Sequence, residues 1–102
     1  MLIDNMKAEN IRQERTQIAE TAFIDVVIWH VPAPLAGSSH RFKYRLDLIA
    51  DGRCVLRYDN EAGKGDHKHF GRKQVAYNFK NLDQLRIDFD ADVTEWLRRI
   101  QI

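Results

Sequence analysis

Apolar and charged side chains alternate from Ser39 to Ile49, and no other feature of the sequence restricts the fold so strongly. An extended strand turns the two sets to opposite sides: Phe42, Tyr44, Leu46 and Leu48 against Arg41, Lys43, Arg45 and Asp47. A period of two is typical of a β-strand with one face on a core and one in water. The segment from Arg53 to Asp59 repeats the pattern, so the two segments predict an antiparallel hairpin.

The loop of this hairpin can be predicted because opposed residues point to the same face of a sheet. A two-residue turn at Asp51 and Gly52 would set Leu46 against Arg57, which mixes apolar with charged positions. A three-residue loop ending at Gly52 sets Leu46 against Leu56 instead. Such a loop also needs a left-handed residue at its last position, which glycine supplies. We therefore expect the three-residue loop.

This register has a consequence on each face of the hairpin. It places Cys54 in the core on the inner face. On the outer face it sets Arg45 against Arg57, in a basic row that Lys43 and Arg41 extend. Like charges in direct opposition destabilise a sheet. Two interpretations stay open: a solvated basic face with splayed side chains, or a face that binds an anion such as a phosphate or an acidic partner.

The segments before the hairpin predict further strands, and residues 69–77 after it predict a short extended segment. Phe23 to Val31 is β-branched, aromatic and almost continuously apolar, as a central strand is, and the prolines at 32 and 34 end it. Residues 7–19 fit either a strand or an N-terminal helix. We favour an edge strand, because a turn into the next strand follows. Residues 1–6 are expected to fray.

Residues 81–100 have the pattern of an amphipathic helix. Asn81 is a candidate N-cap, with Gln84 at the third helical position. Apolar side chains recur at steps of three and four: Leu82, Leu85, Phe89, Val93, Trp96, Leu97 and Ile100. The sequence thus predicts a single α+β domain over residues 1–102. Its antiparallel sheet would be a meander of about four to five strands, with the C-terminal helix packed on one face.

Composition narrows the class of protein. A chain of 102 residues with 44% hydrophobic and 30% charged residues is typical of one globular domain. Its one cysteine, Cys54, excludes an intrachain disulfide and fits a reducing compartment. No apolar run reaches the length of a membrane span, and no signal peptide is recognisable. We therefore expect a cytoplasmic protein with no membrane partner.

Polar residues suited to chemistry gather between Arg57 and Gly71, a stretch that we interpret as a loop on this scaffold. It holds three of the five glycines and two of the four histidines. His67 and His69 would share a face if their segment is extended. One imidazole could take the proton from a ribose 2′-hydroxyl while the other protonates the leaving oxygen. The stretch therefore suits a metal-independent ribonuclease.

Charged neighbours complete this hypothesis. Lys64 or Lys68, together with Arg57, would stabilise charge in the transition state. Asp59 or Asp66 could hold one histidine in a single tautomer. The predicted catalytic residues are His67, His69, Asp59 and Lys68, and the predicted substrate-binding residues are Arg45, Arg57, Lys43 and Lys64. No cofactor is expected.

Other interpretations stay open. The histidines could be ordinary surface residues of a polar loop. The basic face and the 59–69 loop could form a non-enzymatic module that binds nucleic acid or protein. A zinc or manganese site from His67, His69, Asp59 and Asp66 ranks last, because the nearby lysines repel a cation. Trp29 could stack on a base, although we expect it to be buried.

Several motifs of the chain resemble those of one family. They are His40 to Arg45, the Asp51-Gly52 pair, and above all Arg-Tyr-Asp-Asn at 57–60 followed by His-Lys-His at 67–69. From about residue 28 to about residue 96, the sequence resembles the TumE family of small bacterial toxins. That family usually has an Asp-Gly turn in its first hairpin, where this chain has Ala-Glu-Thr-Ala at 19–22.

The resemblance implies a growth-inhibiting toxin that a cognate antitoxin neutralises, commonly a DNA-binding protein with a helix-turn-helix. It does not supply a catalytic mechanism, so the ribonuclease hypothesis rests on the residues. RNA is the expected substrate or ligand. We also expect a homodimer, because exposed sheet edges in small domains favour association.

Overall fold

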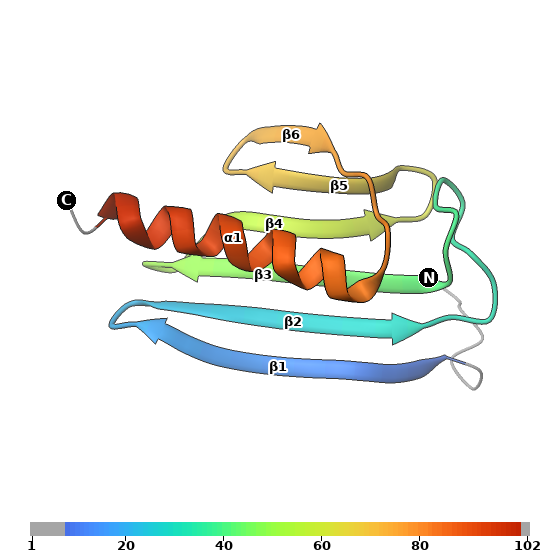
Figure 1. Cartoon of the computed structure of the whole chain (residues 1–102), viewed down its shortest axis with the longest axis horizontal. Helices are drawn as coiled ribbons and strands as arrows, with labels where there is room; N and C mark the ends of the chain where they lie inside the picture. Colours follow the sequence, from blue (N-terminus) through green and yellow to red (C-terminus); the bar gives the residue numbers. More distant parts are fainter. Residues whose placement is uncertain (1–7, 101–102) are drawn as a thin grey trace.

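A computed structural model describes residues 8–100 of the protein, and the expected fraying of residues 1–6 lies outside this range. The elements in chain order are β1 (Glu9–Ala19), β2 (Ala22–His30), β3 (Phe42–Ala50), β4 (Arg53–Glu61), β5 (Gly65–Phe70), β6 (Lys73–Ala76) and α1 (Leu82–Ile100). Each strand pairs antiparallel with the next, so the sheet has the order β1-β2-β3-β4-β5-β6 (Figure 1). The predicted meander and C-terminal helix are confirmed, but the sheet has six strands rather than four to five.

The strand that the sequence analysis missed is β5, which lies in the stretch interpreted as a loop. Strand β4 continues to Glu61, and β5 begins at Gly65 after a short turn. Gly63 and Gly65 have φ angles of 84° and 75°, which glycine adopts without strain. Both faces of β5 carry polar side chains up to Phe70, so apolar alternation could not reveal it.

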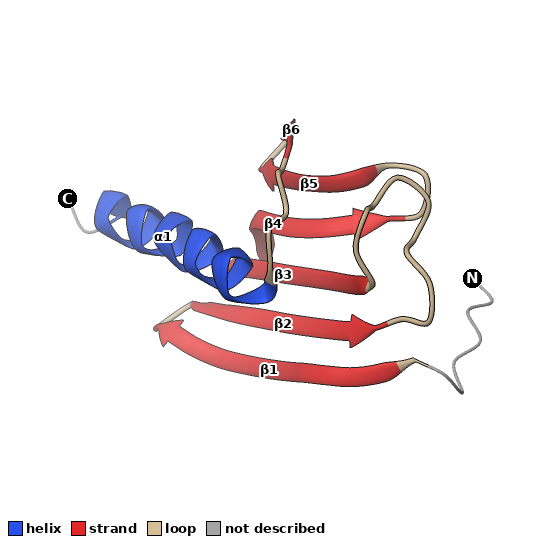
Figure 2. Cartoon of the chain, turned by 45° about the vertical axis from the view of Figure 1, so that its right-hand side comes forward, coloured by secondary structure: helices blue, strands red, loops and turns tan. Residues whose placement is uncertain are grey.

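Helix α1 covers one face of the sheet, and the core lies between the two (Figure 2). Leu46 and Leu48 of β3 and Leu85 and Phe89 of α1 are fully buried there. Each side chain of this kind contributes on the order of 1.5–3 kcal/mol when it leaves water. No helix of residues 8–100 packs on the other face, which we call the open face. Within the same residues, no helix has both the length and the apolar character that a membrane span needs.

Two predictions about the ends of the fold are confirmed. Strand β1 is an edge strand, paired only with β2. Asn81 caps α1, since its Oδ1 accepts a 2.7 Å hydrogen bond from the backbone N–H of Gln84. The side chain of Gln84 donates to Asp88 instead of returning to Asn81, so only half of the capping box forms.

The predicted register of the β3–β4 hairpin is wrong. Asp51 and Gly52 have φ angles of 51° and 75°, and they form a two-residue turn that pairs Ala50 with Arg53. Positive φ at both central residues is what a type I′ turn requires. A register shift then follows between Leu48 and Ile49, so that Val55 is an extra residue in β4. Such a bulge restores the apolar pairing that a two-residue turn alone would lose.

The bulge changes the partners on both faces of the hairpin. Cys54 lies before it and is exposed, so its predicted core position is wrong. Beyond it, Arg57 pairs with Asp47, and Arg45 pairs with Asp59. The two arginines expected to oppose each other therefore face acids.

The connector between β2 and β3 packs against the β4–β5 turn. The backbone N–H of Gly63 donates to the carbonyl of Ala36 over 2.6 Å. A Cβ on Gly37 would lie 2.7 Å from the backbone nitrogen of Gly65, so the two segments approach at glycines. This contact fixes where β5 begins.

Candidate functional site

The pairing of the strands arranges the open face in rows that cross the sheet. One row contains Val27 of β2, Arg45 of β3, Asp59 of β4 and His67 of β5, with Ala76 of β6 at its end. Side chains opposed in this way lie about 4.5–5.5 Å apart at Cβ. An imidazole, a carboxylate and a guanidinium are thus neighbours on one surface.

The adjacent row carries the second imidazole. It runs from Asp25 through Asp47 and Arg57 to His69, with Gln74 of β6 at its end. His67 and His69 are two residues apart on β5 and point to the same face. Their ring centres are 6.5 Å apart. The extended form of this segment therefore places the two imidazoles side by side.

Hydrogen bonds orient both rings. His69 Nε2 lies 3.2 Å from Oδ1 of Asp59, and the His69 side chain is 30% exposed. His67 Nδ1 lies 3.2 Å from the carbonyl oxygen of Gly65. A carbonyl can only accept, so Nδ1 of His67 donates the hydrogen bond. The neutral ring of His67 then has its lone pair on Nε2.

Asp47 lies between two arginines of the open face, Arg57 and Arg45. It is buried, and Oδ1 accepts a 2.7 Å hydrogen bond from Nε of Arg57. That bond is the main reason why the pKa of Arg57 is raised. Arg45 Nε lies farther from Asp47, at 3.6 Å, and its side chain is 59% exposed. The open face therefore carries both positive and negative side chains and is not uniformly basic.

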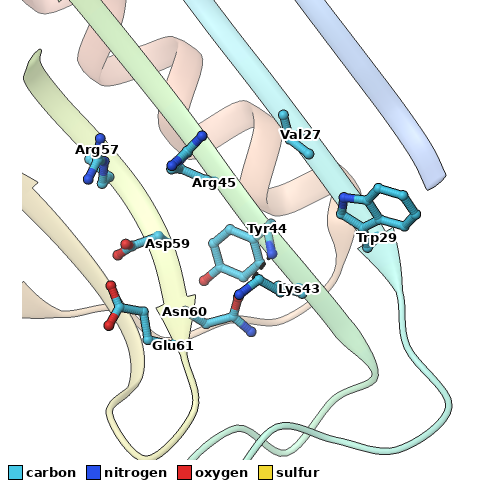
Figure 3. Close-up of a pocket in the computed structure, with 9 residues that line it drawn as sticks. All are labelled: Val27, Trp29, Lys43, Tyr44, Arg45, Arg57, Asp59, Asn60 and Glu61. Carbon is cyan, nitrogen blue, oxygen red and sulfur yellow. Dashed lines mark hydrogen bonds between the residues drawn. The ribbon is translucent and has the colours of Figure 1, made fainter. Parts of the chain in front are cut away.

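A groove of about 290 Å³ lies on the open face (Figure 3). It is lined by Val27, Trp29, Lys43, Tyr44, Arg45, Arg57, Asp59, Asn60 and Glu61. A smaller hollow adjoins it and includes both histidines, together with Asp59, Glu61, Lys64 and Gln74. Trp29 is half-buried at the open face and not in the core, so the expectation of a buried side chain is wrong.

All the predicted site residues except one lie at this surface. Lys64 lies in the β4–β5 turn, 68% exposed, with its Nζ 3.5 Å from Glu61. Lys68 is the exception, because it pairs with Tyr58 and points to the helix side of the sheet. Its Nζ is 3.5 Å from Asp92 of α1. The structure does not bring Lys68 to the imidazoles, since neighbours on a strand point to opposite faces.

Asp66 also faces away from the imidazoles and organises a separate polar cluster. Its carboxylate accepts hydrogen bonds from Ser38 Oγ (2.8 Å) and the Tyr44 hydroxyl (2.7 Å) and lies 2.7 Å from His40 Nε2. The backbone N–H of Phe42 donates to Nδ1 of His40, so Nε2 carries the proton and donates to Asp66. Burial and Asp66 together raise the pKa of Tyr44.

Each of the two aspartates contacts a different histidine. Asp59 orients His69, whereas Asp66 binds His40. Asp66 precedes His67 in β5, so the cluster anchors the beginning of this strand. The carbonyl of Gly65, which binds the His67 ring, lies at the same end of the strand. No pattern in the sequence indicated this function for His40, because its partner is 26 residues away.

The proposed ligand set for a metal does not come together. Asp66 is on the opposite face from His67, His69 and Asp59. Among residues 8–100 no group of three or more His, Cys, Asp or Glu side chains is placed to hold a metal ion. The side chains that do come together suit proton transfer and anion binding.

Comparison with known proteins gave one match. A family model described as "Toxin TumE" matches residues 2–97, which is most of the chain. No curated protein matches the sequence, and no solved structure matches the fold.

Proposed function

The chain belongs to the TumE family of toxins, and from its own residues we propose that it cleaves RNA without a metal ion, with His67 and His69 as an acid–base pair. It would act as the toxin of a bacterial toxin–antitoxin pair. The observation that carries the proposal is the adjacent placement of the two imidazoles on the open face. Asp59 and Arg57, on the neighbouring strand, supply an orienting carboxylate and a cation.

The two histidines differ in a way that assigns their roles. His67 donates from Nδ1 to the Gly65 carbonyl, so Nε2 is free to accept a proton. His69 contacts the carboxylate of Asp59, and we assign it the role of the proton donor. His67 therefore removes the proton of the ribose 2′-hydroxyl, and His69 gives a proton to the 5′-oxygen that leaves. The 2′-oxygen forms a bond to phosphorus as the bond to the 5′-oxygen breaks, which leaves a cyclic phosphate.

The spacing of the rings suits this reaction. Ring centres 6.5 Å apart leave room for one phosphoryl group, since each nitrogen would lie about 2.8 Å from an oxygen on phosphorus. Arg57 is paired with His69, and Lys64 lines the hollow that holds both imidazoles, so the two cations would stabilise the negative charge of the transition state. Acid–base catalysis by positioned side chains contributes roughly 10²–10⁴-fold.

A second candidate is a binding module without catalysis. It is favoured by the larger groove, which holds Arg45, Arg57 and Lys43 but neither imidazole. This module would bind nucleic acid or protein through the groove and residues 59–69, which form part of the β4–β5 hairpin and not the expected loop. It predicts salt-dependent binding with no product.

Membership in a toxin family implies an antitoxin partner. We propose a helix-turn-helix protein for this partner, a homodimer for the toxin and a cytoplasmic location. Co-purification with the product of the adjacent reading frame tests the first, and mass in solution tests the second. Both measurements are independent of RNA cleavage.

Cleavage of single-stranded RNA in excess chelator tests the proposed function. We expect products that end in a cyclic phosphate, and a loss of roughly 10²–10⁴-fold for His67→Ala or His69→Ala. His30→Ala is the matched control, because this imidazole packs against Phe42 away from the site. Absence of cleavage by the wild type, or cleavage that survives both substitutions together, would overturn the proposal.

A further inference from the structure

Trp29 lies at one end of the groove on the open face, and we propose that its indole stacks on an unpaired base of single-stranded RNA bound across the sheet. This inference rests on the proposed function and names the form of its substrate. Trp29 is near the end of β2, is half-buried, and points to the same face as Lys43, its partner on β3 (Figure 3). A flat apolar ring beside cations is the usual surface for a nucleobase.

The cations of the groove form a path from Trp29 to the imidazoles. Lys43 and Arg45 follow on β3, and Arg57 on β4 lies beside His69 on β5. Strands are about 4.8 Å apart, so Trp29 and the histidines are separated by roughly 14 Å across the sheet. A short run of nucleotides spans this distance. The phosphates would pass over the cations while one base rests on the indole.

Acidic residues in the groove limit where the phosphates pass. Asp59 is held by His69, and Glu61, 57% exposed, lies 3.5 Å from Lys64. No carboxylate of residues 8–100 forms an ion pair with Lys43, so its charge is available to a ligand. A carboxylate repels phosphate but accepts from the amino groups of bases. We therefore place the bases, and not the backbone, over Glu61.

The ligand must be single-stranded for this contact to form. In a duplex the faces of the bases are covered by their neighbours, whereas a single strand can present them to an aromatic ring. Loss of one such stacking contact weakens binding by roughly 5- to 150-fold. The inference thus predicts discrimination between single strands and duplexes of the same sequence.

Fluorescence of Trp29 tests this inference without any cleavage. The chain has two tryptophans, so Trp96→Phe leaves Trp29 as the single reporter. The probe is single-stranded DNA, which lacks the 2′-hydroxyl and cannot undergo the proposed reaction. We expect quenching of Trp29 by the single strand and little by the duplex. Trp29→Ala should bind the single strand roughly 5- to 150-fold more weakly, and Trp29→Phe should lose less.

Further variants and ligands separate the proposal of base stacking on Trp29 from the proposal of RNA cleavage. Glu61→Gln keeps an oxygen that accepts from the amino groups of bases but removes a charge that repels the phosphates of the strand, so binding should tighten while quenching remains. Unchanged affinity of a folded Trp29→Ala variant would overturn the inference, as would equal quenching by duplex or by an acidic peptide. Quenching by single strands without RNA cleavage would overturn only the ribonuclease proposal. Cleavage without quenching would overturn only the stacking of a base on Trp29.

Discussion

Nε2 of His69 lies 3.2 Å from Oδ1 of Asp59, its diagonal neighbour on β4. The carboxylate orients the ring and places a negative charge beside it. An asparagine side chain in its place would keep a hydrogen-bond acceptor but remove the charge, so Asp59→Asn separates these two effects.

We expect Asp59→Asn to reduce kcat for RNA cleavage by roughly 10- to 100-fold, since a hydrogen bond to a charged group contributes about 1.5–3 kcal/mol. KM should not rise, because the substitution also removes a charge that repels phosphate. Steady-state kinetics measure both quantities. A wild-type kcat in a folded Asp59→Asn protein would show that Asp59 does not assist His69.

Asp66 should matter for stability more than for binding. Its nearly buried carboxylate receives hydrogen bonds from Ser38, His40 and Tyr44. In Asp66→Asn the side-chain NH2 group would point at groups that donate hydrogen bonds to the carboxylate. Each buried group left unsatisfied in this way costs about 1–3 kcal/mol. We expect Tm to fall by roughly 4–8 °C for each kcal/mol lost. Ser38→Ala removes one of these donors and should cost less; an equal loss would contradict the central position of Asp66.

Acid should weaken the contact between β1 and α1. Hydrogen bonds, the strongest from Arg86 and others from Thr16 and Arg12, lower the pKa of Glu14 from 4.5 to about 2. A lowered pKa means that the stabilisation is complete above pH 4.5 and is lost as the pH falls toward 2. Solvent reduces its size to on the order of 1–2 kcal/mol. Urea unfolding of Glu14→Gln should therefore lack this part of the pH dependence.

Glu20→Gln is the matched control for that experiment, because Glu20 is an exposed glutamate in the turn of the same hairpin. It should follow the wild type through the same pH range. A Glu14→Gln protein with the same acid sensitivity as the wild type would contradict the assignment to the Glu14–Arg86 pair.

The contact between the connector and the β4–β5 turn can be tested at glycine. Gly37 has a φ of 91°, and a Cβ there would lie 2.7 Å from the backbone nitrogen of Gly65. Gly63 also has a positive φ, of 84°, but a Cβ there meets nothing within 4 Å. Both alanine variants incur backbone strain of about 1–2 kcal/mol.

Gly37→Ala should lose more stability than Gly63→Ala, because only Gly37→Ala adds a steric clash to the strain. Thermal unfolding of the two variants measures the difference. Gly37→Ala should also slow RNA cleavage, since the displaced turn carries the Gly65 carbonyl that holds His67. Equal stability of the two variants would show that the connector can move away at little cost.

Patterns that depend on near neighbours predicted the fold well. The alternation around Leu46 and the Asn81 cap are local, so the hairpin and the start of the helix could be found in the sequence. Strand β5 was missed because both of its faces are polar. The register was wrong because Cys54 and Val55 are both apolar, and such a pair does not reveal which residue is the bulge.

Features of the site that depend on distant contacts could not be predicted. Lys68 faces the opposite side of the sheet from the two histidines. This separation can be predicted only once β5 is known to be a strand. The pairing of Arg57 with Asp47 depends on the bulge. The binding of Asp66 to His40 depends on the course of the connector.

A substrate with sulfur in place of the 5′-oxygen at one linkage tests the division of labour between His67 and His69 most directly. A thiolate leaves without a proton donor, so His69→Ala should cleave this linkage within about tenfold of the wild-type rate. His67→Ala should remain slower by roughly 10²–10⁴-fold on both the sulfur and the oxygen substrates, because removal of the 2′-proton is still required. Rescue of His67→Ala, or equal defects of the two variants on the sulfur substrate, would contradict the account.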